Sequence, residues 1–543
     1  MLGESTAQLM QEAGLPELTL MNWFLAALPV IIVLALMVGF DMSGARAGVI
    51  SWLTSIAVIY FKFGGDASVI ATGTLKGLWS TIFVLLIVWS SMFLYNIVDL
   101  SGSFEVISNT FTKLTHGNKM LQLLLIGWTF TTFIQGVAGF GAPVAVATPL
   151  LIGLGFDPLT AAITALLGHS WGITFGSLGA SYSVLLQLSP VEAAPMAFWG
   201  GIFIALGGVL TGFAIILNYD GLKGLKDGWL AVISLSIVMG ATLMVGTTFI
   251  SPYIATFITG AVGLAFGSFV LPKFPQYQPQ ADAEMPEVSA EVEEKSFWEA
   301  FSAYVILIVI VFAVYLIGPV NDFLSQDMFK VGLPFGEIST SFGYTELAEA
   351  KYSPLAFFTT PGVLIILSSL AAAAYYKSKG LMPEGSVKKA WDKTLTQSIG
   401  STAVIMPMTM MALTITAGGL TTFIAYGIAT SAGKFFPILA PFIGLLGGFV
   451  TSSGTSSNIL FTSLQYEVAD ILTISPYIVL AMQTSASSLS NSFSPANAAL
   501  GTGVSGQSGR EGEILKVTGV INVIQALIIG VVGYLLINAG FGL

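Results

Sequence analysis

Two glycine-rich interruptions within apolar sequence are the features of this chain best suited to chemistry. The first is Gly139-Phe140-Gly141-Ala142-Pro143, and the second runs from Gly168 to Gly179. Glycine and proline at this density break a helical ladder and free backbone N–H and C=O groups. In lipid such groups would be unpaired, so broken backbone persists only where it lines a cavity or site. Exposed N–H groups of a glycine-rich turn bind carboxylate without a charged side chain. We therefore expect the five residues of the first interruption to contact a small anion.

Hydroxyl and amide side chains are concentrated in the second half of the chain. They fall in two segments, Thr451–Asn458 and Ser485–Asn497. Both group types donate and accept hydrogen bonds, which suits a small carboxylate that also carries a hydroxyl. The expected substrate contacts here are Thr455, Ser456, Ser457, Asn458, Asn491 and Ser494. Alternatively, the pairs Ser457-Asn458 and Ser490-Asn491 could supply oxygen ligands to Na⁺.

Two single side chains beside the interruptions are further candidates. His169 stands in the second interruption, at membrane depth, where an ionisable residue is by default a functional hypothesis. We interpret it as a substrate contact or a proton-coupling group; a neutral histidine hydrogen-bonded for packing is the equal alternative. Gln135 precedes the first interruption and could contact substrate or cap the broken turn. The only arginines are Arg46 and Arg510, outside the apolar runs, which favours a monocarboxylate over a dianion that needs an arginine clamp.

The elements that must position these residues are membrane helices. Mean hydropathy is +0.85, with 55% hydrophobic and 9% charged residues, as in multi-span membrane proteins. The apolar runs do not alternate in polarity, which excludes a membrane β-barrel. We predict an all-α polytopic protein with about 12–14 spans, including re-entrant hairpins and broken helices. Lys76, at the start of one run, is expected to snorkel to the interface, and Asp157 to stabilise a turn before Pro158.

Other function classes are not supported by the sequence. There are no cysteines, which excludes disulfides and thiolate metal sites. Neither a zinc-protease HExxH motif nor a paired-aspartate motif is present, and no strand or Walker lysine accompanies the Gly-x-Gly patterns. We expect no enzyme activity, no cofactor, no bound metal and no nucleic-acid partner. The expected partners are a small organic anion and membrane lipid.

An acidic, proline-punctuated linker over residues 272–296 divides the chain into two halves. Residues 1–271 contain the broken region 133–182, and residues 297–543 contain the broken region 447–500. Aligning Pro158 with Pro476 gives an offset of 318 (476 − 158), which also sets Gly139 on Ser457. Paired interruptions in corresponding halves are typical of a secondary transporter's binding site. Because few identities match, two unrelated polar breaks remain the alternative.

Orientation follows from the distribution of lysines. The loop after Tyr376 holds Lys377, Lys379, Lys388, Lys389 and Lys393, so we predict that it is cytoplasmic. Counting spans back places residues 321–353 outside and the acidic linker inside. By the same count the N-terminus lies outside.

Three motifs carry a resemblance to a known family. They are residues 135–144 (QGVAGFGAPV), residues 153–159 (GLGFDPL), and Thr455-Ser456-Ser457-Asn458 with Leu464-Gln465 following. These motifs resemble the bacterial L-lactate permease family, within the wider ion transporter superfamily. The resemblance implies proton-coupled uptake of L-lactate, D-lactate and glycolate across the inner membrane of a prokaryote.

At the level of fold, the resemblance implies two inverted repeats, re-entrant hairpins, and a homodimer with scaffold and elevator-like transport domains. The sequence departs from the relatives at Gly168-His169-Ser170-Trp171-Gly172, where an Asn-Thr-Ala-Pro-like break is common, and at Gly454, where an acidic residue is familiar. At both positions the departure leaves the substrate and the coupling ion open. Sodium coupling and a passive organic-anion channel are therefore the alternatives.

Overall fold

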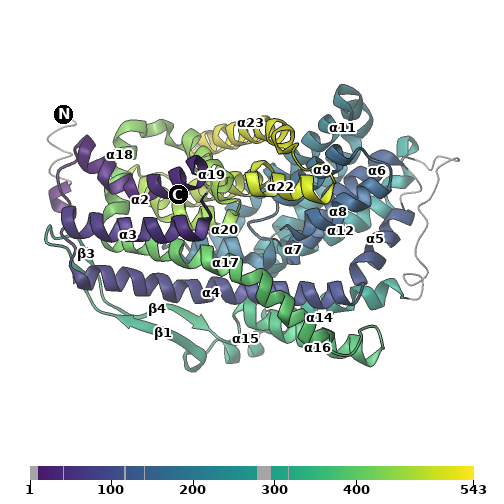
Figure 1. Ribbon diagram of the computed structural model, residues 1–543, viewed down its shortest axis with the longest axis horizontal. Helices are drawn as coiled ribbons and strands as arrows, with labels where there is room; N and C mark the ends of the chain where they lie inside the picture. The colour runs from purple at the N-terminus through teal and green to yellow at the C-terminus, as the bar shows by residue number, and fades with distance from the viewer. Residues whose placement is uncertain are drawn as a thin grey trace.

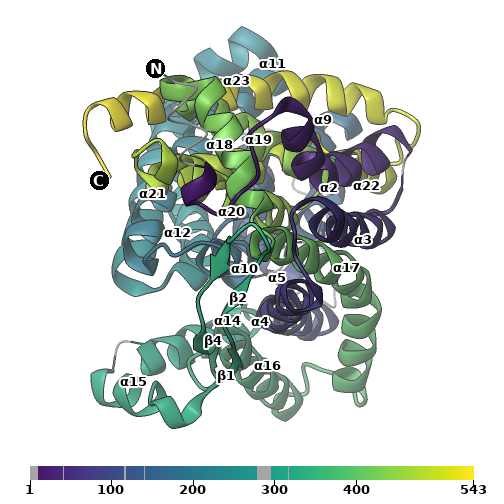
Figure 2. The ribbon, with the colours of Figure 1, turned by 90° about the vertical axis from the view of Figure 1, so that its left-hand side faces the viewer.

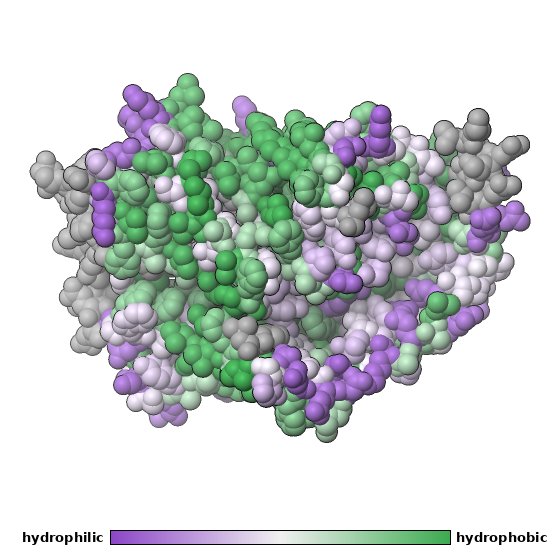
Figure 3. All heavy atoms as spheres, turned by 180° about the vertical axis from the view of Figure 1, so that it is seen from behind, coloured by the Kyte–Doolittle hydropathy of each residue, from purple (hydrophilic) through white to green (hydrophobic). Residues whose placement is uncertain are grey.

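Long apolar helices make up most of the chain, which confirms the predicted fold class. The computed structural model describes residues 10–40, 42–114, 118–137, 139, 141–277, 295–315 and 317–542. Within these ranges, ten helices are long and apolar enough to cross a membrane. One of them, Ala193–Ile250, leaves helical geometry at Asp220 and Gly221, and each of its two arms is long enough to span a bilayer. Figure 3 shows broad apolar areas on one face, with hydrophilic residues gathered mainly toward its ends and lower edge.

The helices fall in two series. In the first half they are α2 (Leu20–Gly39), α3 (Gly44–Lys62), α4 (Ala67–Leu100), α5 (Ser103–Leu114), α6 (Lys119–Leu124), a π-helical stretch (Leu125–Phe130), α7 (Thr131–Val137), α8 (Ala142–Gly153), α9 (Pro158–Ser170), α10 (Ala180–Gln187), α11 (Ala193–Val245) and α12 (Ala255–Phe269). In the second half they are α14 (Phe297–Tyr315), α15 (Gly318–Leu324), α16 (Pro361–Ser378), α17 (Ser386–Ala417), α18 (Leu420–Ala432), α19 (Phe436–Thr451), α20 (Gly454–Ile471), α21 (Pro476–Leu489), α22 (Pro495–Val504) and α23 (Glu511–Asn538).

Helices α4 and α17 pack together along much of their length. Gly73 and Gly77 allow this close approach, because a Cβ on Gly73 would lie 2.7 Å from the Thr414 Cα and one on Gly77 2.5 Å from the Met410 Cα. In Figure 2 this pair stands between a layer of α14, α15, α16 and strands on one side and the bundle of α18 to α23 on the other. Helices α4 and α17 therefore link the layer of α14, α15, α16 and strands to the bundle of α18 to α23.

The loop predicted to lie outside the membrane contains short strands, beside the otherwise helical fold. Strands β1 (Lys330–Phe335) and β4 (Glu349–Ala356) pair antiparallel with irregular register, and β2 (Ile338–Ser339) pairs with β3 (Thr345–Glu346). We call residues 330–356 the strap. Figure 1 shows it alongside α4. Strands are permitted here because only the bilayer core restricts the chain to helices and closed barrels.

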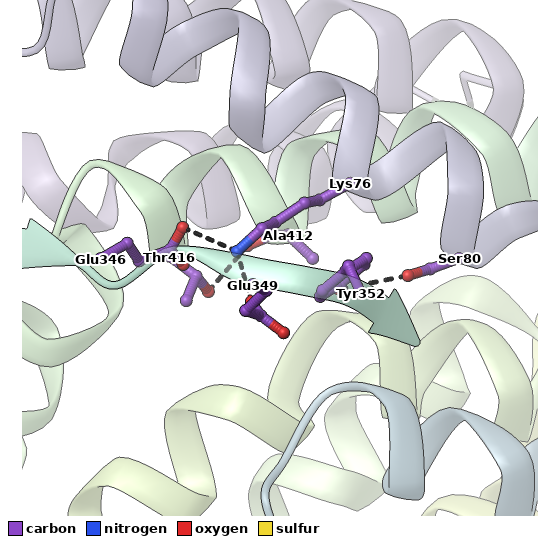
Figure 4. Close-up of polar contacts among 7 residues, drawn as sticks. All are labelled: Lys76, Ser80, Glu346, Glu349, Tyr352, Ala412 and Thr416. Atoms are coloured by element: carbon purple, nitrogen blue, oxygen red, sulfur yellow. Dashed lines mark hydrogen bonds and ion pairs between the residues drawn. The ribbon is translucent and has the colours of Figure 1, made fainter. Parts of the chain in front are cut away.

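The strap corrects the expectation for Lys76. This lysine is 4% exposed and does not snorkel. Its Nζ lies 3.1 Å from Glu346 Oε2 and 2.8 Å from Glu349 Oε1, and 4.9 Å from the ring centre of Tyr352 (Figure 4). The Tyr352 hydroxyl lies 3.3 Å from the hydroxyl of Ser80, one turn along α4. The carboxylates of a distant loop thus reach the lysine, so the charge of this buried side chain is paired by two partly exposed carboxylates.

Each half contains a hairpin of two helices between two breaks in the backbone. The second arms, α9 and α21, both begin with proline and are N-capped by Asp157 and Ser475, so the offset of 318 aligns them and Asp157 has the predicted turn role. The first arms do not align at this offset, because α20 has 18 residues and α8 only 12. The prediction that Gly139 overlies Ser457 at a break is therefore wrong: Ser457 lies in the first turn of α20.

The two hairpins lie toward opposite ends of the molecule. Figure 1 shows α8 and α9 near α5 and α6, whereas α20 lies nearer to α2 and α18. Lys119 donates a hydrogen bond to the Leu154 carbonyl in the α8–α9 turn, and Ser475 donates one to the Gly542 carbonyl at the α20–α21 turn. This arrangement is what an inverted repeat would produce, and the repeat itself stays a prediction.

Candidate functional site

Four backbone breaks surround the centre of the helical bundle. The first break lies between α7 and α8, the second covers residues 171–179, the third is Ser452-Ser453, and the fourth covers residues 490–494. Phe140, a predicted contact in the first break, lies outside the described residues. Close contacts at glycines and hydrogen bonds connect each break with the next, so that the four breaks form a closed ring.

Gln135 connects the first and second breaks. A Cβ on Gly139 would lie 2.5 Å from Ser177 Oγ and 3.2 Å from Gln135 Nε2, and one on Gly176 would lie 2.8 Å from the same Nε2. Gln135 is 1% exposed, and its Oε1 has no hydrogen-bond partner among the described residues. Gly139 and Gly176 thus leave room for the Gln135 side-chain amide, whose oxygen Oε1 has no hydrogen-bond donor among the described residues. Because buried polar atoms are almost always paired, this oxygen marks a place for a ligand or water.

The second break contains a left-handed turn that sequence reasoning missed. Ser177, Leu178 and Gly179 have φ values of 47°, 51° and 78°, and only the glycine adopts this region without strain. Ser91 of α4 lies 3.4 Å from the Ser177 carbonyl and donates to it. Strained backbone of this kind clusters at functional sites. No residue type at positions 177 and 178 signals the turn.

The second break contacts the third break and α21. A Cβ on Gly454 would lie 2.9 Å from Ile173 Cγ2. The Thr174 hydroxyl lies 2.9 Å from that of Thr484 and 2.8 Å from that of Ser488, so hydroxyls from the two halves meet directly. Thr174 and Thr484 were absent from the predicted set. The sequence signal that could have identified them is a hydroxyl residue within a mainly apolar segment.

The third and fourth breaks meet, and the fourth returns to the first. The Phe449 and Phe493 rings stack 4.5 Å apart. The Ser487 hydroxyl lies 3.4 Å from the Gly454 carbonyl. Helices α8 and α22 pack together, and a Cβ on Gly141 would overlap the Leu500 side chain. The four breaks therefore form one connected ring to which both halves contribute.

Four helices begin at this ring, and their first amides differ in what they bind. Ser453 caps α20, and α10 begins with backbone bonds from Ala180 to Ser177 and from Tyr182 to Thr174. Helices α8 and α22 have no side-chain cap, although the Ala142 amide of α8 donates to the Gly139 carbonyl at 3.2 Å. Uncapped N-termini present N–H groups and the positive ends of the helix dipoles. The starts of α8 and α22, two helices that pack against each other, are thus the part of the ring suited to an anion.

Among the predicted residues of α20, Asn458 has a structural role. Its side chain is fully buried, with Nδ2 2.9 Å from both Ser181 Oγ and Thr484 Oγ1, while Oδ1 accepts from Gln483 Nε2 at 2.9 Å. Asn458 therefore joins α10, α20 and α21 and has no group left for a substrate.

The other predicted residues at the start of α20 differ in availability. The Ser456 amide donates to Ser453 Oγ at 3.2 Å, and Ser457 donates to the Gly444 carbonyl at 3.1 Å. The hydroxyls of Thr455 and Ser456 make no hydrogen bond to any described residue. Of the four predicted contacts in this segment, Thr455 and Ser456 therefore have free hydroxyls.

Side chains of the fourth break bond mainly to its own backbone. Ser490 and Asn491 donate to the Ser487 carbonyl at 2.7 and 3.1 Å, and Ser494 donates to the Asn491 carbonyl at 3.1 Å. These bonds shape the turn that starts α22. In the described part of the chain, no hydrogen bond joins Ser457 or Asn458 to Ser490 or Asn491, so the two pairs named for Na⁺ do not meet directly.

His169 is the only histidine, acidic or basic residue in segments 120–156, 158–191, 435–466 and 476–509. It is 3% exposed, and its Nδ1 lies 3.2 Å from the Ala165 carbonyl. Because a carbonyl only accepts, Nδ1 carries the hydrogen and Nε2 is the basic nitrogen. Arg510 is exposed and binds both carboxylate oxygens of Glu513, at 2.6 and 2.9 Å, instead of folding back to the ring.

Comparison with known proteins agrees with these features. The family model described as L-lactate permease matches residues 22–539. Glycolate permease GlcA of Escherichia coli (strain K12) is 27% identical to this chain, with 93% of this chain and 94% of that protein covered. An L-lactate permease of Halalkalibacterium halodurans is 26% identical, with 91% and 93% covered, and one of Escherichia coli (strain K12) is 25% identical, with 94% of each covered.

Among solved structures, the Alcanivorax borkumensis YdaH transporter is weakly similar, with a TM-score of 0.45 and 13% identity over 87% of this chain and 88% of that one. The family match rests on the sequence comparisons and spans nearly the whole chain. The chain therefore belongs to the L-lactate permease family and is an integral inner-membrane permease, not an enzyme.

Proposed function

We propose that this protein imports small 2-hydroxymonocarboxylates, L-lactate, D-lactate and glycolate, by symport with protons. The observation that carries the proposal is a pair of packed helices, α8 and α22, that both start without a side-chain cap in a ring without lysine or arginine. Each N-terminus is equivalent to roughly +0.5 of a charge, so two of them balance one carboxylate. The names of the relatives, lactate and glycolate permeases, support this substrate class.

The hydroxyl of the substrate has a matching group in the ring. The free Oε1 of Gln135 accepts a hydrogen bond, so it can receive the 2-hydroxyl of lactate. The Thr455 hydroxyl can both donate and accept. In this proposal the carboxylate lies at the helix starts and the hydroxyl points toward Gln135.

For coupling, we propose that His169 takes up the transported proton on Nε2. It is the ring's only residue of the types that change charge near neutral pH. Sodium coupling is the second candidate, favoured by the ring's uncharged oxygens at Ser490 and Asn491. A passive channel would use the same ring, but it would not accumulate substrate against a gradient.

The conformational cycle and the assembly are proposed from the family resemblance. We propose that the hairpins move as a transport domain against a scaffold containing α4 and α17, and that the protein is a homodimer. The Ser91 contact with the strained second break would then lie at the boundary between the two parts. Cross-linking of paired cysteines introduced at positions 91 and 177, in inward- and outward-facing conditions, tests the movement.

The substrate assignment is tested with lactate and propionate, which lacks the 2-hydroxyl. In proteoliposomes, counterflow of labelled lactate should be inhibited by unlabelled lactate better than by propionate. In Gln135→Leu this preference should fall by about 3- to 10-fold, the worth of one hydrogen bond. Thr462→Val, which alters a buried hydroxyl of α20 outside the ring, is the control. An unchanged preference in Gln135→Leu would remove Gln135 from the site.

A further inference from the structure

An apolar groove runs between the first arm of α11 and α23. The two helices contact each other. Its volume is about 740 Å³. The apolar lining includes Leu210, Phe213, Val517, Val520, Ile524 and Ile528. None of these residues belongs to the ring of breaks, so the groove is separate from the proposed transport site.

The polar lining of the groove gathers mainly at one end. Asn218 lies just before the kink that ends the first arm of α11, and Glu513 and Lys516 lie in the first two turns of α23. The Tyr219 and Phe156 rings, 5.6 Å apart, place this end beside the α8–α9 turn. The lysine distribution predicts that this is the cytoplasmic side, whose membrane surface is anionic.

The charges at this end leave a cation available. Arg510 neutralises Glu513 through two bonds, at 2.6 and 2.9 Å. Within the described ranges, Lys516 has no carboxylate at ion-pair distance. Asn218 Nδ2 is buried and has no hydrogen-bond partner there. A lysine ammonium and a free amide N–H together suit a phosphate group.

The length of the groove matches one membrane leaflet. Lys516 and Ile528 are separated by 12 residues (528 − 516), or ~18 Å of helix at 1.5 Å per residue. Half of a bilayer's hydrocarbon core is about 15 Å thick. A diacyl lipid with its phosphate at Lys516 would therefore place an acyl chain along the whole apolar lining.

We propose that this groove binds a phospholipid, whose phosphate is held by Lys516 and Asn218 and whose acyl chain fills the space between α11 and α23. Free phosphate would use the polar end but none of the apolar lining. A packed helix of another protein would fill the lining but leave Lys516 and the Asn218 amide without an anion. A phospholipid would both fill the apolar lining and place an anion at Lys516 and the Asn218 amide.

The test compares two lipids that differ in the headgroup. Delipidated full-length protein in detergent is titrated with dioleoylphosphatidylglycerol or dioleoylglycerol, and bound lipid is counted by native mass spectrometry. Wild-type protein should retain the phospholipid preferentially. Lys516→Ala should weaken phospholipid binding about fivefold, the effect of one lysine near an anionic surface, and leave dioleoylglycerol binding unchanged. Asn218→Leu should weaken phospholipid binding in the same direction.

Two variants serve as controls. Lys516→Arg keeps the charge and should bind nearly as wild type. Lys223→Ala removes a lysine near the kink that pairs with Asp220 at 3.3 Å and does not line the groove, so binding should not change. Equal retention of both lipids by wild-type protein, or equal losses in Lys516→Ala and Lys223→Ala, would overturn the proposal. Displacement of the phospholipid by millimolar inorganic phosphate would identify an anion site without a lipid.

Discussion

Replacing Asn458 with alanine should destabilise the protein strongly, because its side chain links three helices in the interior. Nδ2 has two hydrogens to donate among three acceptors within 3.1 Å, and Oδ1 accepts one bond from Gln483. The substitution therefore removes three hydrogen bonds at a fully buried position.

The magnitude follows from these bonds. At about 1 kcal/mol net for each, the loss is ~3 kcal/mol, and the buried donor of Gln483 left without a partner adds about 1–3 kcal/mol. We therefore expect a decrease of about 4–6 kcal/mol in the free energy of unfolding. Such a loss exceeds the effect of most single substitutions.

The assay is denaturant unfolding of detergent-solubilised protein, with lactate binding measured in parallel under stabilising conditions. Thr455→Ala is the matched control: it removes a hydroxyl of the same helical turn that bonds to no described residue. This control should change stability by less than about 0.5 kcal/mol and weaken lactate binding. If Asn458→Ala unfolds like wild type and loses lactate binding, Asn458 contacts the substrate and the structural interpretation is wrong.

Further predictions concern the strap and the first break. Lys76→Ala should lower stability by about 1–3 kcal/mol, because it removes both ion pairs and a buried side chain that lies over the Tyr352 ring. Glu349→Gln should cost less than ~1 kcal/mol, because Glu349 is 44% exposed and Glu346 still pairs with the lysine. Thermal unfolding that ranks these two variants in the reverse order would contradict the role of Lys76 in holding the strap. Gly141→Ala should raise the KM for lactate, because φ is +85° and the added Cβ would overlap Leu500, at a strain of about 1–2 kcal/mol. Gly153→Ala, at the open end of the same helix, is its control, and equal KM values for both variants would refute the role of the first break.

The parts of the fold that could be predicted depend on local sequence. Apolar run length predicted the membrane helices, and glycine density placed the first break beside Gly139 and Gly141. Proline with a preceding Asp157 or Ser475 marked the starts of α9 and α21, since an N-cap and a first-turn proline act within one helical turn.

The parts that were missed depend on residues distant in sequence. Lys76 meets Glu346, 270 residues away, so its burial is invisible to local reasoning. Asn458 was predicted to contact substrate, but in the structure its amide group is hydrogen-bonded to Ser181 and Gln483. The left-handed turn at Leu178 contains a residue type that normally avoids this conformation, and surrounding contacts impose it.

The central claim is coupled transport of a 2-hydroxymonocarboxylate, and one measurement tests it most directly. Purified protein in liposomes is given labelled L-lactate under an inward proton gradient, with and without Na⁺. We predict accumulation above the external concentration that requires the proton gradient, is independent of Na⁺, and falls in His169→Gln more than lactate counterflow does. Accumulation that follows Na⁺ and ignores the proton gradient, or flux that never exceeds equilibrium, would contradict the account.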